Sequence, residues 1–430
     1  MKKILFVIIA VLIVKQSVFS QDAFEKISFN FDGLARIRYE FLNNNSSLGI
    51  SNDERDYFRF KFSGGVLADF FSIFSVYGKA TTESRSYIYN ADGDTRYDIN
   101  EVIIDSLFIN FPKLLGTFDV KVGRIDLAAN EYGEGFLFAD GTPLDGSRTF
   151  YFNAARLRYT MPQSSIEFMT IYNSEFDELP VINSLDRKLN DSQESALVLY
   201  ARSQITNRLY IEPYYIWKNE KTDNNILYLN KDVSINTIGS YLRYDLTSIA
   251  FRAQAAAQLG NYDDETGRAF GGYVYADLPL LNIFKPLSVG YIYLSGDDPN
   301  TKNVEAWNPL FSRYPWVSEI LATLYSSESA VAYWTNLQLA RIEANFKPYK
   351  KVSINTSYDF IYANAAIQNS TNNIFGDGLN RGNLIRCKIS YGFSNNFGAS
   401  ALVEYFIPGD FYYKDAQDAS FFRFEFAAKI

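Results

Sequence analysis

Histidine is absent from this chain, and cysteine occurs once, as Cys387. Without histidine the chain has no imidazole general base, no imidazole metal ligand and no Ser-His-Asp triad. A single cysteine excludes an intrachain disulfide and a thiolate zinc site. We therefore expect a protein that is not an enzyme and that carries no cofactor and no metal. A carboxylate-only protease is the remaining catalytic alternative, because a barrel phospholipase would need a Ser-His pair.

Proline is scarce, with 12 in 430 residues, and no proline-rich linker divides the chain. The one long apolar run, residues 4–14, follows Lys2 and Lys3 and ends at Lys15. It is shorter than the ~20 apolar residues that a transmembrane helix needs. We predict a signal peptide over residues 1–20, cleaved after Ser20, and prefer it to an N-terminal membrane anchor. Residues 21–430 then form one exported domain.

Aromatic residues are abundant, with 32 Tyr and 36 Phe, and they alternate with polar residues along much of the chain. Such period-two alternation predicts half-buried strands. One face of the first such segment carries Phe29, Phe31, Ile37 and Tyr39, and the other carries Asn30, Asp32, Arg36, Arg38 and Glu40. Charged residues in the middle of aromatic strands favour a membrane barrel over a soluble all-β sandwich. In such a barrel alternate side chains face lipid, and their neighbours face a water-filled bore.

The chain ends in a strand. Phe422, Phe424, Phe426, Ala428 and Ile430 alternate with Arg423, Glu425, Ala427 and Lys429. A barrel closes when its last strand pairs with its first, so a terminal strand without a tail fits closure. We expect an all-β transmembrane antiparallel barrel of about 16 to 18 strands, because ~9–11 residues cross the membrane per strand.

Five short motifs resemble the alginate export family of outer-membrane porins. In chain order they are Arg36-Ile37-Arg38-Tyr39-Glu40; Val122-Gly123-Arg124 with Asp145-Gly146-Ser147-Arg148; Gln254-Ala255-Ala256-Ala257-Gln258-Leu259-Gly260; Ser295-Gly296-Asp297 with Trp307-Asn308-Pro309-Leu310-Phe311; and Phe406-Ile407-Pro408-Gly409-Asp410-Phe411. The family usually has Gln where this chain has Ile125. The resemblance implies an eighteen-stranded monomeric barrel whose lumen arginines guide an anionic polysaccharide outward.

The alternation places basic residues on the polar, inward face. The candidate substrate-guiding residues are Arg36, Arg38, Arg59, Lys61, Arg156, Arg158, Arg243, Arg252, Arg341 and Arg386. Acidic residues share this face, among them Glu40, Glu167, Glu212, Glu343, Asp359 and Glu404. Guanidinium groups bind carboxylates in two-point fashion, so the basic excess predicts a lumen that favours anions. The alternative is that arginine-carboxylate pairs, such as Arg341 with Glu343, only brace the wall.

Three further features have simple interpretations. Tyr214, Tyr215, Trp217 and Trp334 are expected in the aromatic girdle at the membrane interface rather than as sugar-stacking platforms. Asp297 and Asp298 are expected in a solvated acidic turn rather than a calcium site. Cys387 is expected on the lipid face as a small apolar residue.

We therefore predict a channel in the outer membrane of a Gram-negative bacterium, passing polar or anionic solutes, with an acidic polysaccharide such as alginate as one candidate. The alternatives are a general porin without anion preference and a structural or adhesive barrel with a sealed pore. The expected partners are outer-membrane lipid, lipopolysaccharide and the solute itself. No nucleic acid is expected, and we expect a monomer.

Overall fold

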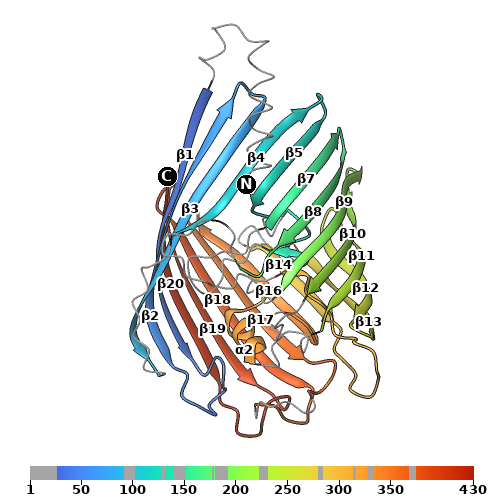
Figure 1. Cartoon of the computed structure of the whole chain (residues 1–430). Helices are drawn as coiled ribbons and strands as arrows, with labels where there is room; N and C mark the ends of the chain where they lie inside the picture. The colour runs from blue at the N-terminus through green and yellow to red at the C-terminus, as the bar shows by residue number, and fades with distance from the viewer. Residues whose placement is uncertain are drawn as a thin grey trace.

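The last strand of the chain pairs with the first and closes the sheet on itself (Figure 1). In the computed structural model the amide of Ile430 donates to the carbonyl of Gly33 at 3.0 Å, and the amide of Gly33 donates back at 3.3 Å. The wall is one antiparallel sheet of 18 strands, which confirms the predicted fold. Closure satisfies the backbone groups that an open sheet edge would expose to lipid.

The structure describes residues 27–91, 102–127, 131–139, 152–176, 179, 192–221, 231–278, 284–312, 316–327, 334–367 and 374–430. The predicted signal peptide, residues 1–20, lies outside the described residues. So do Asp145 to Arg148 of the second family motif.

The wall strands run in chain order, and each pairs with its sequence neighbours. They are β1 (Ile27–Asn43), β2 (Arg55–Phe70), β3 (Phe74–Asn90), β4 (Ile103–Leu114), β5 (Phe118–Ile125), β7 (Phe152–Met161), β8 (Ser164–Asn173), β9 (Gln193–Thr206), β10 (Leu209–Lys221), β11 (Val233–Asp245), β12 (Ala250–Tyr262), β13 (Glu265–Leu278), β14 (Phe284–Leu294), β16 (Leu337–Tyr349), β17 (Val352–Tyr362), β18 (Asn380–Gly392), β19 (Phe397–Pro408) and β20 (Ala419–Lys429). Two short strands, β6 (Phe138–Ala139) and β15 (Phe311–Ser312), and the helix α2 (Glu319–Ser327) lie in the connections.

The two ends of the barrel differ. Short turns, such as residues 115–117, 162–163 and 350–351, join strands at the end where β1 begins and β20 finishes. Most connections at the other end are long, and the one between β14 and β16 spans residues 295–336. Outer-membrane barrels have short periplasmic turns and long extracellular loops, so the end where β1 begins and β20 finishes faces the periplasm.

The outer face is a belt of apolar side chains. Phe29, Phe31 and Ile238 are 59%, 71% and 64% exposed, while Arg36 and Glu40 on the opposite face of β1 are buried. The alternation therefore places aromatic residues toward lipid, as predicted from the sequence. No helix in the described part of the chain is long and apolar enough to cross a membrane.

Two long connections fold back into the barrel. The first inward loop is residues 131–139, and the second is residues 304–312 and 316–327, which include α2. They meet where β6 and β15 pair in parallel, with the rings of Phe138 and Phe311 stacked 5.2 Å apart. Figure 1 shows α2 within the ring of strands.

The hydrophobic core lies under these loops, inside the barrel. Phe138, Phe311 and Ile320 are fully buried, and they pack with inward-facing wall residues such as Ile171, Val198, Ile216, Ile235 and Leu339. Burying this apolar surface holds the loops in place. The expectation that every inward side chain faces a water-filled bore is therefore wrong for these wall positions. The inward face is apolar where the loops cover it and charged elsewhere.

Candidate solute-conducting lumen

All ten predicted basic residues lie on the inward face of the wall, and each has a carboxylate oxygen within 4.0 Å. The basic residues therefore occur in groups with acidic residues, and they do not form a row of unpaired cations along the lumen. Nine of them are well packed, whereas the side chain of Arg243 is 51% exposed beside Asp245. The wall-bracing alternative is thus present in the geometry, and the function of each group depends on its balance of charge.

The first group spans β20, β1, β2 and β3. Strand pairing places Arg36 opposite Lys61 and Arg38 opposite Arg59, so like charges face each other across the sheet. Buried carboxylates relieve this repulsion: Glu83 accepts from Arg36 at 2.9 Å and from Arg59 at 2.7 Å. Glu40 accepts from Arg59 at 3.3 Å and from Arg423 at 2.7 Å. Arg38 donates to Glu425. Removing one member would leave a buried charge without its partner.

The second group gathers on β7, β8 and β9 around Glu167, which is fully buried. Arg158 donates to Glu167 at 2.7 Å, and Arg156 and Arg202 approach it at 4.0 Å and 3.7 Å. Glu131 of the first inward loop joins them, accepting from Arg156 at 3.1 Å and from Arg158. Asp119 on β5 lies 3.8 Å from Arg156, so three guanidinium groups face three carboxylates, one of which belongs to the loop.

The third group fixes the other half of the first inward loop. Arg252 on β12 donates to Asp277 at 2.6 Å and also to Glu134 of the loop. Gly133 lies between the two acidic anchors with a left-handed φ of +63°, and a Cβ there would overlap Gln254. Glycine therefore lets the loop turn against the wall.

The fourth group supports the second inward loop. Arg341 on β16 and Asp359 on β17 form a two-point pair at 2.6 and 2.7 Å. Arg386 on β18 donates to Glu404 on β19 at 3.2 Å. Glu404 in turn accepts from the first turn of α2, so this pair links the wall to the helix.

Two of the family motifs contact each other in the lumen. The side-chain amide of Gln258 donates to the carbonyl of Asn308 at 2.8 Å, and the amide of Asn308 donates back at 2.9 Å. Trp307 is buried and stacks on Phe136 at 5.1 Å. These motifs therefore specify how the second inward loop docks on β12.

The sequence interpretation missed several lumen residues. Arg423 was visible in the alternation of the last strand, and Arg202 lies two positions after the inward Tyr200, but neither was among the candidates. Lys218 is buried and donates to the carbonyl of Leu310 at 2.7 Å, which anchors the second inward loop. Glu131 and Glu134 were not among the candidates either, since no periodicity marks a connection that folds inward.

The predicted aromatic girdle is partly wrong. Tyr214 and Trp334 are buried in the lumen: Tyr214 stacks on Tyr200 at 5.6 Å, and Trp334 packs edge-on against Tyr325 of α2 at 5.5 Å. Tyr215 is 41% exposed on the outer face, as a girdle residue would be. Parity explains the error, because Tyr214 lies two positions from the inward Glu212.

The acidic turn after β14 is held by its own hydrogen bonds. Asp297 accepts from the amide of Glu305 at 2.8 Å, and Asp298 accepts from the amide of Asn300 at 2.9 Å. Burial raises the pKa of Asp297, aided by the charge of Glu305, while the hydrogen bonds from Asn300 lower the pKa of Asp298. This arrangement fits the predicted acidic turn.

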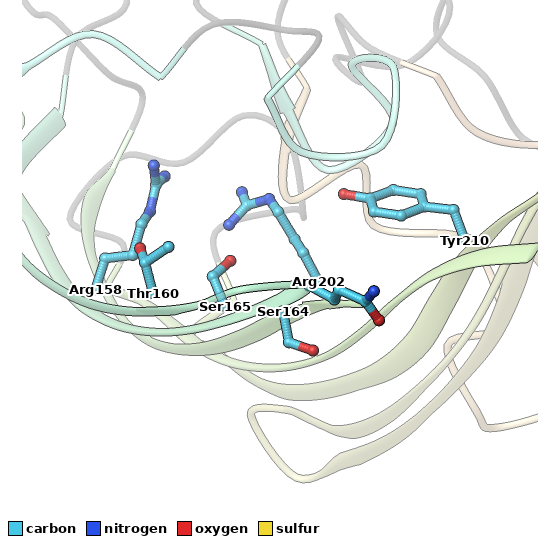
Figure 2. A pocket seen from close by; sticks show the side chains of 7 residues that line it. Arg158, Thr160, Ser164, Ser165, Arg202 and Tyr210 are labelled. Carbon is cyan, nitrogen blue, oxygen red and sulfur yellow. The ribbon is translucent and has the colours of Figure 1, made fainter. Parts of the chain in front are cut away.

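A polar pocket of about 310 Å³ opens near the periplasmic end of the second group (Figure 2). It is lined by Arg158, Thr160, Gln163, Ser164, Ser165, Arg202 and Tyr210. Figure 2 shows the guanidinium groups of Arg158 and Arg202 rising from the same side of the wall. The volume lies at the lower end of the range for small-molecule sites.

Comparison with protein families gives one match, in which the model described as Alginate export covers residues 28–425. A comparison with curated proteins gave no significant match.

Solved structures share the fold. OccAB1 of Acinetobacter baumannii superposes with a TM-score of 0.58 at 11% identity, over 94% of this chain and 96% of that chain. OprD of Pseudomonas aeruginosa gives 0.57 at 10% identity, over 94% and 93%. OccK2 (OpdF) of Pseudomonas aeruginosa, solved in complex with glucuronate, gives 0.58 at 11% identity, over 94% and 98%. At such identities the likeness is one of fold.

Proposed function

The chain belongs to the alginate export family, and on that premise we propose that its lumen passes anionic solutes, with uronates and acidic polysaccharides such as alginate as the substrate class. The protein is a porin-like channel of the Gram-negative outer membrane and not an enzyme. The finer proposal concerns what the channel selects.

The balance of charge in the lumen groups carries the proposal. Around Glu40, Glu83 and Glu425 the wall brings together five cations, namely Arg36, Arg38, Arg59, Lys61 and Arg423. Around Glu131 and Glu167 it brings together Arg156, Arg158 and Arg202. Arg423 also pairs with Glu319, so the first group has five cations to four carboxylates and keeps an excess of one positive charge. Arg156 also lies 3.8 Å from Asp119, so the second group is balanced. In a narrow, low-dielectric tube such an excess lowers the free energy of an anion and raises its local concentration.

A sealed structural barrel is the second candidate, and the apolar core inside the barrel favours it. Phe136, Phe138, Trp307 and Phe311 form a packed aromatic cluster across the two inward loops. If these loops never move, solute passage is confined to the part of the lumen that the charged groups of the wall line. Measurable conductance therefore separates the two candidates.

Uptake into proteoliposomes tests the proposal. Glucuronate should enter faster than glucose, a neutral sugar of similar size, because the lumen excess attracts the carboxylate. The double variant Arg36→Gln, Lys61→Gln should reduce this ratio, because it removes two of the five cations of the first group, both of them beside Glu83. Lys350→Gln, on an exposed periplasmic turn, is the matched control and should leave the ratio unchanged. Equal entry of the two sugars would indicate a general porin instead.

We also propose that residues 1–20 are removed on export and that residues 21–430 act as one single-chain monomeric barrel in contact with outer-membrane lipid and lipopolysaccharide. The exposed apolar belt on β1, β2 and β11 supports the lipid contact. A detergent-solubilised mass equal to that of two or more chains would contradict the monomer.

A further inference from the structure

The pocket at the periplasmic end and the first inward loop share two arginines. Arg158 lines the pocket and donates to the carboxylate of Glu131. Arg202 lines the pocket and donates to the backbone carbonyl of Glu131 at 2.8 Å. The side chains of Arg158 and Arg202 are 24% and 15% exposed, and that of Glu131 is 29% exposed. All three groups are thus within reach of a solute in the lumen.

We propose that the Glu131 carboxylate is a built-in competitor for a uronate-type solute, whose carboxylate takes its place on Arg158, replaces the backbone carbonyl of Glu131 on Arg202 and loosens this anchor of the first inward loop. On Arg158 one carboxylate replaces another, and on Arg202 the solute carboxylate replaces a backbone carbonyl. The exchange therefore changes no covalent bond and moves no proton. This inference rests on the proposed function, because it assumes that anionic sugars enter the lumen.

The remaining lining fits the rest of a sugar acid. Thr160 and Ser165 present hydroxyl groups and Gln163 presents an amide, which are the partners that sugar hydroxyls need. Tyr210 donates to Glu212 at 2.8 Å, which fixes its ring at the edge of the pocket. A planar guanidinium pair with neighbouring hydroxyls discriminates a uronate from a neutral sugar by charge and from a simple anion by its hydroxyls.

The loop has separate anchors on either side of Gly133. Glu134 is held by Arg252, and Tyr241 donates to it at 3.1 Å, independently of the pocket. Exchange at Glu131 therefore releases one anchor of the loop, while Tyr132 stays buried against Tyr200 and Glu134 stays on β12. The solute and the loop oppose each other, so removing the competitor must raise the affinity for the solute.

Calorimetric titration of the whole purified barrel with sodium glucuronate tests this. Glu131→Gln should bind glucuronate about tenfold more tightly than wild type, because Arg158 loses its charged partner. Arg202→Gln should bind about tenfold more weakly, because the pocket loses a charge-assisted donor. Arg208→Gln, at an exposed position on the neighbouring periplasmic turn, removes the same charge outside the pocket and should match wild type. Glucose should show no response to any of these changes.

A second variant guards against misfolding. Glu131→Asp keeps the charge but shortens the side chain, and its affinity should fall between wild type and Glu131→Gln. Each variant should retain the heat-modifiable mobility of a folded barrel. Unchanged or weaker binding by Glu131→Gln would overturn the competition. If glucuronate permeates but Glu131→Gln does not tighten its binding, this inference fails and the proposed function stands; if glucuronate is not preferred over glucose, the proposed function fails.

Discussion

The carboxylate of Glu404 on the barrel wall accepts a hydrogen bond from the hydroxyl of Ser318 at 2.6 Å, at the start of the helix inside the lumen. The same oxygen accepts from the amides of Glu319 and Ile320 at 2.9 and 3.1 Å. Ser318 also caps the helix itself by accepting from Leu321 at 3.2 Å. A negative charge at a helix N-terminus offsets the helix dipole, so the wall holds α2 by charge as well as by packing.

We predict that Glu404→Gln destabilises the barrel by about 2 kcal/mol, because the buried charge-assisted bonds to α2 and to Arg386 are weakened. The measurement is urea unfolding of the refolded protein in lipid. Glu343→Gln is the control, since Glu343 is 23% exposed and lies 3.8 Å from Arg341, so its loss should cost less than ~1 kcal/mol. Equal effects of the two variants would argue against a stabilising contact between Glu404 and the N-terminus of α2.

The buried pair of Arg341 and Asp359 gives a second stability prediction. Asp359→Asn should cost about 3 kcal/mol in the same unfolding assay, because Arg341 would keep its charge in a buried site with only the more distant Glu343 beside it. Asp245→Asn provides the contrast: its pair with Arg243 is half exposed, so water already screens it and the change should stay within ~0.5 kcal/mol. A small effect at Asp359 would show that water reaches the pair.

The contact between the Glu131 carboxylate and Arg158 should depend on pH. Burial alone would raise the pKa of Glu131, but the hydrogen bond from Arg158 and the charges of Arg156 and Arg202 outweigh it and hold the pKa below its ordinary 4.5. Because the folded-state pKa of Glu131 is lowered, its contact with Arg158 is fully present above pH 4.5. The contact weakens as pH falls through that folded-state pKa. Conductance recorded from pH 7 downward should be steady and then change in that acid range. Glu131→Gln should lack this component; an identical profile in the variant would assign the change to other groups.

Crosslinking should report the contact between the two inward loops. Phe138 and Phe311 are register partners in the β6–β15 pair, so Phe138→Cys with Phe311→Cys should oxidise to a disulfide. Cys387→Ser in the same chain removes the native thiol. If the loops move during passage, oxidation should lower conductance and a reductant should restore it. The matched single variant Phe311→Cys should not respond. Failure to crosslink would place the loops apart.

The wall could be predicted from the sequence, because side chains alternate strictly along a strand and lipid demands that one face be apolar. Arg36, Arg59 and Arg341 were placed inward by this rule alone. The interior of the barrel could not be predicted, since the inward loops carry no period that distinguishes them from exposed loops. Glu131 reaches Arg158 across 27 residues, and Glu404 reaches Ser318 across 86. Such long-range pairs decide whether an arginine braces the wall or attracts an anion, and no local sequence pattern encodes them.

The reversal potential across a planar bilayer with a KCl gradient tests the central claim most directly, because its sign reports which ion the lumen favours. The positive excess around Arg36 and Arg38 predicts a reversal potential close to that of chloride. Neutralising Arg36 and Lys61 together should reduce this selectivity. A potential of the opposite sign, set by potassium, would contradict an anion-conducting lumen.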